Sequence, residues 1–449
     1  MKNKVEIFEN KPIAHALAIM AVPTIVSQLI TLIYNIADTW FIGQTGNPYM
    51  VAASSLVATI YLMTTAIANI FGTGGGNLVV RLLGKGDEYE ARKVASLSLV
   101  MALGSAFTFS VLCLIFMNPL LEVLGASENT IGYARQYLIS VVVIGSAPTI
   151  LSSTMSAMLR NNGYSKEAAF GLGMSGMLNV VLDPLFMFVI LPNGYEVMGA
   201  GIATMLSNIV ALIYYISIYK KVEDNSVLEI PKNIVRIRPE SMKSLFSVGM
   251  PAALSVLLYD LTNMVINMLS SSHGDLELAA IGIVLKVERL PLNIGIGICL
   301  GMVPLVAYNY AAENRKRMKD FFVAARFAGV IVAVLCVILY RVMALHIIGA
   351  FISDAETVRL GTEFLKARCF ATPFMFLSFH MVHFMQAIDK GKISMYLAII
   401  RQLCLNIPIL FIMNYMWQMN GIIWTQVTAD IINVIASYII YNNVMKKEV

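Results

Sequence analysis

Charged residues are scarce in this sequence of 449 residues, and no long polar region interrupts it. Asp, Glu, Lys and Arg make up 13% of the chain, hydrophobic residues make up 58%, and the mean hydropathy is +0.74. A soluble domain of this size cannot bury so much apolar surface. The longest polar stretch runs only from Lys220 to Ser244, which also excludes a sizeable water-soluble domain.

Cysteines are few, and their placement argues against a disulfide framework. The chain has five, an odd number, with no CxxC spacing, and each falls in an apolar run. This pattern favours buried thiols over disulfides or a metal centre. The positions are Cys113, Cys299, Cys336, Cys369 and Cys404.

A nucleotide-binding loop is also lacking. The glycine-rich segment GTGGGNLVV, residues 72–80, does not end in the GK[ST] that binds phosphate and Mg²⁺. We expect these glycines to allow close helix packing instead. We therefore expect no cofactor, and an ion gradient as the energy source. The net charge of +5 comes from residues between the apolar runs, which favours membrane orientation over nucleic-acid binding.

Apolar runs of about twenty residues recur along the chain, and each can cross a hydrocarbon core about 30 Å thick. Continuous runs indicate helices, because membrane strands would alternate polar and apolar residues. The sequence predicts an all-α polytopic membrane protein with twelve spans. Their approximate limits are 14–42, 51–80, 94–117, 131–158, 168–190, 199–218, 246–271, 277–307, 321–350, 360–387, 394–416 and 420–442.

Connections that carry Lys and Arg alternate with connections that lack both, and only the ninth connection is ambiguous, with Arg341 at one end of it. They occur in segments such as RLLGKGDEYEARK and ENRKRMK, but not in GQTGNPY, LPNGYEVMG or SSSHGDLE. The positive-inside rule then places both termini in the cytoplasm, and an even number of spans agrees with this placement. We expect a multi-pass protein of the plasma (inner) membrane, in contact with lipid, and we expect a monomer.

The two halves of the sequence resemble each other at a nearly constant offset of 224 to 228 residues. The matches include Pro23 with Pro251, Asn35 with Asn263, Gly163 with Gly391, and Pro184 with Pro408. A unit of about 225 residues holds six spans. Because six is even, the halves should be related by an axis along the membrane normal, in a V shape with a central cleft. We expect an N-terminal lobe over 1–219, a cytoplasmic linker over 220–244 and a C-terminal lobe over 245–449.

Two aspartates lie inside spans of the first half, Asp38 in YNIADTWFIG and Asp183 in MLNVVLDPLFMF. Ionisable groups inside the membrane are expensive and indicate function by default. Tyr34 and Asn179 each lie four residues before one of these acids, on the same helix face. Pro184 should loosen its helix and free backbone carbonyls. This cluster could bind a proton, or Na⁺ at Asp38, Asp183 and Asn179.

The repeat places apolar residues opposite both acids, because Asp38 aligns with Ile266 and Asp183 with Ile407. The acids should therefore serve an activity confined to the first half. The alternative is a hydrogen-bonded pair that only fixes helix packing. Burial disfavours the charged form of a carboxyl, and two neighbouring acids share a proton. Loading and release of that proton would bias how the helices pack.

The second half carries its own charges, namely Asp260 in span seven and Lys286, Glu288 and Arg289 in the LKVERLPL segment of span eight. We expect these four residues to line a substrate cleft or to pair across it, and Lys286 or Arg289 could pair with Asp260. The alternatives are snorkelling to the interface and a static ion pair.

Four further residues are weaker candidates. Arg401 and Asp430 lie in spans eleven and twelve, and His380 and His383 lie three residues apart in span ten. Three residues is a possible metal-ligand spacing, but no cysteine or carboxylate stands beside the histidines. Core packing or cleft lining is therefore favoured, and no metal site is predicted there.

At these residues the chain resembles the multidrug and toxic compound extrusion (MATE) family, over essentially its whole length. The likeness rests on twelve spans in two halves and on Pro23 and Asp38, with FIG after them, in the first span. RLLGKGD after span two, LNVVLDPLF in span five and MVPLVAYNYAAENRKRMKDF closing span eight look most like the bacterial branch that includes the staphylococcal multidrug exporter.

The resemblance implies a secondary active exporter, which moves organic cations or toxic compounds by alternating access against inward H⁺ or Na⁺. It implies a coupling site in the first lobe made of Asp38, Asp183, Tyr34, Asn179 and Thr204 of span six. Ser207 or Asn208 could serve in place of Thr204. The acids that other branches use in span seven correspond only loosely to Asp260.

Two other functions compete with this hypothesis. Flippases of lipid-linked precursors share the wider fold, and Lys286, Arg289 and Arg401 would suit their cationic cleft, but such proteins usually have extra spans. An intramembrane hydrolase could use Asp38 and Asp183 as a carboxylate pair, but the sequence has no GxGD or HExxH motif. We therefore expect a transporter of small molecules and not an enzyme.

Overall fold

The computed structural model describes residues 2–231 and 236–448, and this part of the chain is helical with no strand. Helices are expected here, since each satisfies its own backbone polar groups in lipid. The first half contains α1 (Lys2–Glu9), α2 (Ile13–Gln44), α3 (Pro48–Asn69), η1 (Ile70–Gly75), α4 (Gly76–Gly84), α5 (Glu88–Ile115), α6 (Met117–Val123), α7 (Ile131–Leu138), η2 (Ile139–Ile144), α8 (Ser146–Asn161), α9 (Ser165–Leu185), η3 (Phe186–Ile190), α10 (Glu196–Val222) and η4 (Glu223–Asn225).

The second half contains α11 (Pro239–Ser271), α12 (Asp275–Ala311), α13 (Arg315–Gly349), α14 (Ala355–Arg368), η5 (Cys369–Ala371), α15 (Thr372–Ala387), α16 (Gly391–Ile399), η6 (Ile400–Asn406) and α17 (Ile407–Glu448). The expected linker over 220–244 begins inside α10 and ends inside α11. Its residues 232–235 lie outside the described part, as do the end residues 1 and 449 of the two expected lobes.

The helices accommodate the twelve expected spans. Within the described residues, nine helices are long and apolar enough to cross a membrane, and the bent pair Ile131–Ile144 and Ser146–Asn161 makes a tenth. The helix Gly391–Lys446 has 56 residues and turns at Gln418, where φ is 53° and ψ is −134°, so it holds two crossings. The remaining crossing is made by α14 and α15, which the short η5 turn separates.

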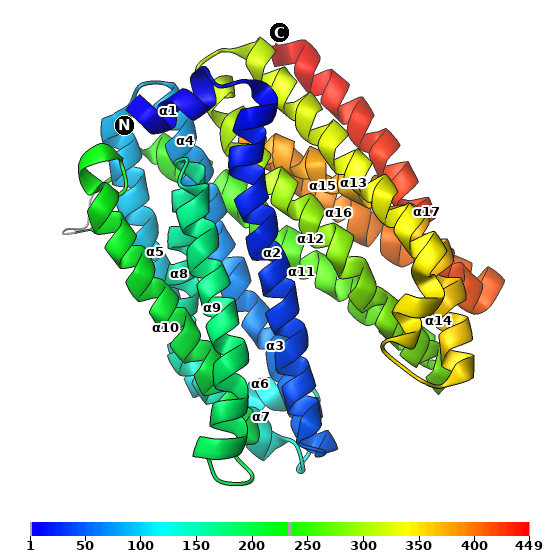
Figure 1. Cartoon of the computed structure of the whole chain (residues 1–449). Coiled ribbons are helices and arrows are strands. Elements are labelled where there is room, and N and C mark those ends of the chain that lie inside the picture. Colours follow the sequence, from blue (N-terminus) through cyan, green and yellow to red (C-terminus); the bar gives the residue numbers. More distant parts are fainter. Residues whose placement is uncertain (1, 232–235, 449) are drawn as a thin grey trace.

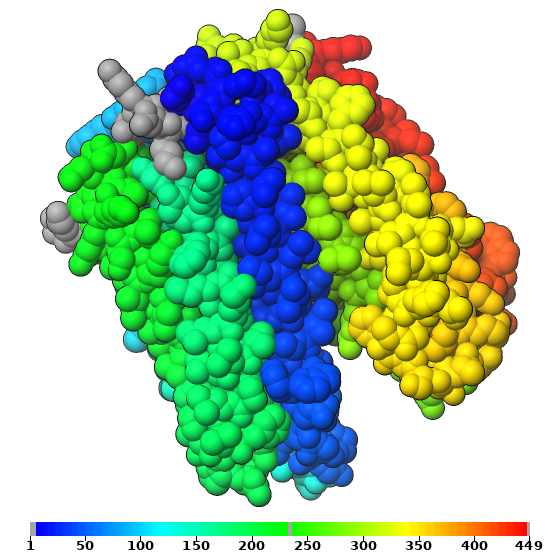
Figure 2. All heavy atoms as spheres, viewed as in Figure 1, coloured from blue at the N-terminus to red at the C-terminus, as the bar shows by residue number. Residues whose placement is uncertain are grey.

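Two bundles diverge from a common contact near the chain termini (Figure 1). In the first half α8 packs against α3, α5, α9 and α10, and in the second half α12 packs against α13, α14 and α15. The bundles meet where α2 packs along α12 and where η1 and α4 pack against α11 and α12. Away from the termini the surfaces of the bundles separate and leave an open cleft (Figure 2).

Glycines bring the two bundles together, because their missing side chains let the backbones approach. A Cβ at Gly74 would lie only 2.8 Å from the Cα of Gly249 on α11. This contact confirms that the glycine-rich segment 72–80 serves close helix packing. On the other pair of helices, a Cβ at Gly301 would lie 2.6 Å from the Cα of Ala21.

Four spans within the described residues contain π-helical turns, namely η1, η2, η3 and η6. A π turn adds one residue to a helix and changes the direction of the side chains that follow it. Of the five cysteines, four are buried as expected, but Cys404 in η6 is exposed. It points away from the bundle because the neighbouring positions of η6, Arg401 and Gln402, face inward and are buried.

Candidate functional site

A buried hydrogen-bonded cluster joins α9 to α10 in the first bundle. Asn179 and Asp183 lie one turn apart on α9, and the Asn179 Nδ2 donates to Asp183 Oδ1 at 3.1 Å. The same Nδ2 lies 3.2 Å from Thr204 Oγ1 on α10. Asn179 and Asp183 are 2% and 0% exposed, so both side chains are removed from solvent. The structure therefore brings together three of the five residues that the sequence singled out.

The other two residues, Tyr34 and Asp38, approach this cluster from α2. The ring of Tyr34 packs against Gly176, where a Cβ would lie 2.8 Å from Tyr34 Cδ1. Asp38 follows one turn later, is half-buried, and interacts electrostatically with Asp183. The small side chains of α9 let α2 come close. We call the region around Asp38, Asp183, Tyr34, Asn179 and Thr204 the polar chamber of the first bundle.

Several acceptor oxygens in this chamber have no hydrogen-bond donor among the described residues. They are Asp183 Oδ2, Asp38 Oδ1 and Asn179 Oδ1. A buried acceptor without a donor is costly, and most such groups in native proteins are satisfied by protein or water. Carboxylate, amide and hydroxyl oxygens are the ligands that hard cations prefer. The chamber thus has the chemistry to take up a proton or a small cation.

Sequence reasoning missed part of this chamber. Tyr61 of α3 and Tyr137 of α7 lie near the two aspartates, and Tyr61 also lies near Thr149 and Asn208. Asn208 Nδ2 also donates to Thr149 Oγ1 at 3.1 Å.

Ser207, which the sequence left as an alternative to Thr204, is buried, but its Oγ has no hydrogen-bond partner among the described residues. Thr204 is therefore the member of this group that contacts Asn179.

In the second bundle, Arg289 pairs with Asp260 at 3.5 Å, as the sequence suggested, and the side chain of Arg289 is 47% exposed. Arg289 and Lys286 lie on the same face of α12 as Gly297, two and three turns before it. Gly297 contacts Ile25 of α2, and farther from the chain termini the surfaces of the two bundles separate (Figure 2). Lys286 is exposed, and its place in the cleft stays a prediction.

Glu288 does not line the cleft, contrary to the sequence-based expectation. Its carboxylate forms two hydrogen bonds with the guanidinium of Arg368 on α14, at 2.9 and 3.0 Å. The side chains of Arg368 and Glu288 are 2% and 8% exposed. Glu288 projects into the second bundle because it lies on the side of α12 opposite the cleft-facing residues, where α14 packs. It forms a buried structural ion pair.

The histidines of α15 also bond within the second bundle. His380 Nε2 lies 3.1 Å from the carbonyl oxygen of Phe322, and His383 Nδ1 lies 2.8 Å from that of Phe379. His380 is buried and stacks on the ring of Phe322. Arg401 pairs with Asp430 deep in the same bundle, at 2.6 Å.

Comparisons with known proteins agree with this architecture. The sequence matches the MatE family over residues 23–185 and 251–412, one match in each half. The multidrug export protein MepA of Staphylococcus aureus strain MSSA476 is 29% identical over 435 residues, which cover 96% of this chain and 94% of that protein. The protein of the same name from Staphylococcus saprophyticus is 28% identical, with the same coverage.

The fold is also that of solved transporters. A structure described as the outward-facing conformation of a multidrug resistance MATE family transporter of the MOP superfamily aligns with a TM-score of 0.93 at 20% identity. The alignment covers 100% of this chain and 99% of that one, which confirms the all-helical fold expected from the sequence. Because the family match spans most of both halves, this chain belongs to the MatE family.

Proposed function

We propose that this chain is a multidrug exporter, which moves organic cations or other toxic compounds out of the cell in exchange for inward H⁺ or Na⁺. Its family membership, the names of its relatives as multidrug export proteins and the cleft between two bundles support this function. It is a transporter and not an enzyme. The comparisons do not favour a lipid-linked precursor flippase, because the relatives are named as multidrug export proteins.

The coupling ion would bind in the first bundle. The observation that carries this assignment is the set of buried acceptor oxygens on Asp38, Asp183 and Asn179 that lack donors in the described chain. A proton on Asp183 would turn Oδ2 from an acceptor into a donor. A sodium ion would instead be coordinated by oxygens of Asp183, Asp38 and Asn179, with the Thr204 hydroxyl beside them. Either ion removes the cost of the buried negative charge.

Ion binding would act on the packing of α2 against α9. With Asp38 and Asp183 both charged, like-charge repulsion and desolvation oppose close approach of the helices. With an ion bound, Tyr34 and Asp38 can settle against Gly176 and Asn179. Because α2 also packs along α12, a change in its position reaches the interface between the bundles. This is a physical link from ion binding to a change in access.

Substrate would bind in the cleft. Apolar side chains of α2, including Ile33, Ile36 and Trp40, are 61%, 42% and 58% exposed and would line the cleft. An aromatic ring and aliphatic groups suit flat, apolar cations. Asp260 supplies a negative charge that an organic cation could share when Arg289 moves aside, and Lys286 would repel it. Substrates would therefore compete with Arg289 for Asp260.

The positive connections support an orientation in the plasma (inner) membrane with both termini in the cytoplasm. The cleft opens away from the termini, so the structure would be open to the outside. In this orientation an outward-open cleft releases substrate and admits the coupling ion. A single chain contains both bundles and the cleft, so a monomer would suffice.

Transport in proteoliposomes tests the proposed function. Ethidium efflux would be followed with an imposed pH gradient and no sodium, and then with a sodium gradient, for wild type and for Asp183→Asn and Asp38→Asn. We expect one gradient to drive efflux in wild type, and we expect either substitution to reduce it to the level of empty liposomes. Glu363→Gln, an exposed acid far from the chamber, should transport as wild type does. Efflux that persists in both asparagine variants would contradict the coupling site.

A further inference from the structure

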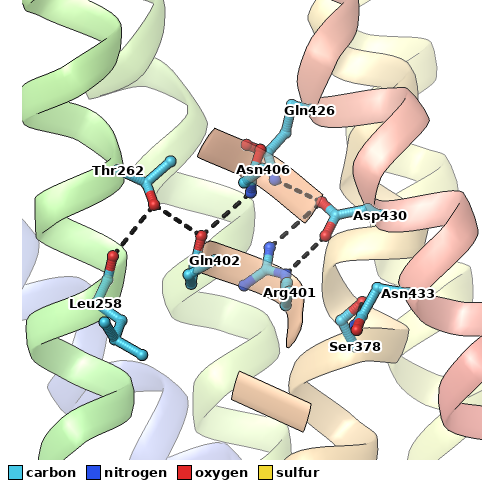
Figure 3. Close-up of polar contacts among 9 residues, drawn as sticks. All are labelled: Leu258, Thr262, Ser378, Arg401, Gln402, Asn406, Gln426, Asp430 and Asn433. Atoms are coloured by element: carbon cyan, nitrogen blue, oxygen red, sulfur yellow. Dashed lines mark hydrogen bonds and ion pairs between the residues drawn. The ribbon is translucent and has the colours of Figure 1, made fainter. Parts of the chain in front are cut away.

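The second bundle contains a buried polar cluster that the proposed transport cycle does not use (Figure 3). Three elements supply it: α11, the π turn η6, and the second part of α17. The Thr262 hydroxyl donates to Gln402 Oε1 at 2.9 Å, and Asn406 Nδ2 donates to the same oxygen at 3.1 Å. Beside them, Arg401 and Asp430 form the ion pair.

Two members of this cluster are repeat counterparts of residues in the first chamber. Thr262 follows Tyr34 by 228 residues, the same offset that separates Pro23 from Pro251. Gly421 matches Gly199 in the motifs that open the last span of each half, which places Gln426 opposite Thr204.

The amide pair of η6 repeats the bonding pattern of α9. Gln402 and Asn406 bond to each other one turn apart, as Asn179 and Asp183 do. Alignment on the two prolines, Pro184 and Pro408, places Asn406 one residue early. The extra residue of the π turn rotates η6 and compensates for this shift, so Asn406 points inward. The second bundle therefore keeps a polar chamber at the position of the first.

The carboxylate of this second chamber comes from a different span than Asp183 does in the first. Alignment on Gly199 and Gly421 puts Asp430 opposite Asn208, so the carboxylate comes from the last span instead of the fifth. Both carboxylate oxygens of Asp430 accept hydrogen bonds from side chains of the protein. Arg401 Nε donates to Oδ1 at 2.6 Å, and Oδ2 accepts from Arg401 Nη2 at 3.3 Å and from Gln426 Nε2 at 2.6 Å.

An aromatic ring covers one face of the Arg401 guanidinium. Arg401 Cζ lies 4.6 Å from the centroid of the Phe379 ring. The side chains of Arg401 and Asp430 are 4% and 0% exposed. In the first chamber, by contrast, Asp183 Oδ2 and Asp38 Oδ1 are buried without a donor among the described residues.

We propose that Arg401 is the resident cation of the second bundle: its guanidinium occupies a cation site that is the repeat counterpart of the coupling site in the first. The ligand class of this site is a planar guanidinium, supplied by the chain itself. A fixed cation neutralises Asp430 in every state of the cycle, so only the first bundle exchanges ions with solution. This contrast rests on the proposed function, whereas the site itself rests on the geometry of the second bundle.

The chemistry of the site explains why arginine serves this role. The N–H groups of a planar guanidinium can donate to both carboxylate oxygens while the plane of the guanidinium stacks on an aromatic ring. The ammonium group of lysine cannot make both contacts at once. A buried ion pair is strongly destabilised when one partner is removed, because the other charge is left uncompensated. When both charges are removed, the cost is much smaller. The site therefore has a distinct signature in a set of single and double variants.

Rescue by a free guanidinium tests the site directly. Arg401→Ala would be purified, and its thermal unfolding followed with millimolar methylguanidinium chloride. We expect the unfolding temperature of this variant to rise in a saturable way by a few degrees, as ligand binding to the folded state requires. Wild type and the double variant Arg401→Ala/Asp430→Asn should not respond. The proposal is overturned if Arg401→Ala shows no saturable rise, or if the double variant shows the same rise.

A second comparison covers the case in which Arg401→Ala does not fold. Arg401→Met/Asp430→Asn, which removes both charges, should unfold at a higher temperature than Asp430→Asn alone and should retain gradient-driven ethidium efflux. A double variant no more stable than the single variant would refute the pairing. A well-folded double variant that loses ion coupling would show that Arg401 and Asp430 take part in ion exchange, against the proposal. Because the unfolding measurements do not depend on transport, failure of the proposed function would be seen separately, as wild type without efflux under any gradient.

Discussion

The guanidinium of Arg81, in the first bundle, lies 2.8 Å from the carboxylate of Asp389, in the second. Arg81 also donates to the hydroxyl of Ser244 at 2.7 Å, and that hydroxyl donates to Asp389 at 2.8 Å. The side chain of Arg81 is only 5% exposed, although that of Asp389 is 42% exposed. This network joins the bundles near the termini, on the side opposite the cleft opening.

Breaking this ion pair should favour the state that opens toward the termini. We expect Asp389→Asn to shift the equilibrium by about 1 to 2 kcal/mol, a five- to thirtyfold change, because the pair is only partly shielded from solvent. Spin labels at Tyr49 and Ser272, on the two sides of the cleft, would report the change by pulsed electron resonance in a Cys404→Ser background. The fraction of molecules with a long distance between the two spin labels should fall in Asp389→Asn and should be unchanged in Glu363→Gln. An unchanged distance distribution would show that the pair does not hold the bundles together.

The contact between α2 and α12 should tolerate no side chain at Gly301. A leucine there meets the backbone of Ala21, and overpacking of this kind costs about 1 to 3 kcal/mol. We expect Gly301→Leu to lower the unfolding temperature in detergent. Gly282→Leu is the matched control on the same helix, because nothing lies within 4 Å of a Cβ at that position. Equal behaviour of the two variants would contradict the close approach of α2 and α12.

Glu288 should matter for stability and not for substrate. Glu288→Gln leaves the buried guanidinium of Arg368 without its countercharge, which costs about 3 to 5 kcal/mol. We expect a large fall in unfolding temperature, with partial recovery in Glu288→Gln/Arg368→Met. Ethidium affinity per folded molecule should be unchanged in the double variant. If ethidium affinity changed while stability stayed normal, Glu288 would act in substrate binding in the cleft.

The N-terminus of α14 should respond to acid. Thr357 N and Oγ1 donate to Asp354 Oδ2 at 2.8 and 2.7 Å and hold the pKa of that carboxyl below its ordinary value. A lowered pKa in the folded state means that this cap stabilises the helix above the ordinary aspartate range and is lost as the pH falls through the folded pKa.

Hydrogen exchange of residues 355–359 measures this effect. Protection should decrease as the pH is lowered through the aspartate range in wild type. The Asp354→Asn variant keeps a capping oxygen but cannot titrate, so it supplies the pH-independent reference. If the protection of residues 355–359 in wild type equals that in Asp354→Asn at every pH, ionisation of Asp354 does not stabilise the N-terminus of α14.

Much of this fold could be predicted from the sequence, because hydropathy alone decides which segments enter a membrane. The apolar runs located the spans, and the cost of a buried charge singled out Asp38 and Asp183. The pairing of Asn179 with Asp183 followed from helical spacing. These are local properties, which a single sequence contains.

The partners of charges on other helices could not be predicted in the same way. Arg368 lies 80 residues from Glu288, and only the packing of α14 against α12 brings them together. The sequence also gives no sign of the π turn in η6, which rotates Gln402 and Asn406 inward. For the same reason, simple alignment of the halves placed Ile407 opposite Asp183 and hid the second polar chamber.

The central claim is that export of substrate from the cleft is coupled to the uptake of an ion at the first-bundle site. The most direct measurement is ion movement driven by substrate: a gradient of ethidium is imposed across proteoliposomes, and internal pH or sodium is followed with a trapped dye. We expect ethidium to drive an opposing flux of one of the two ions in wild type, and we expect this flux to vanish in Asp183→Asn. An ethidium gradient that moves neither ion, in liposomes that do transport ethidium, would contradict the account.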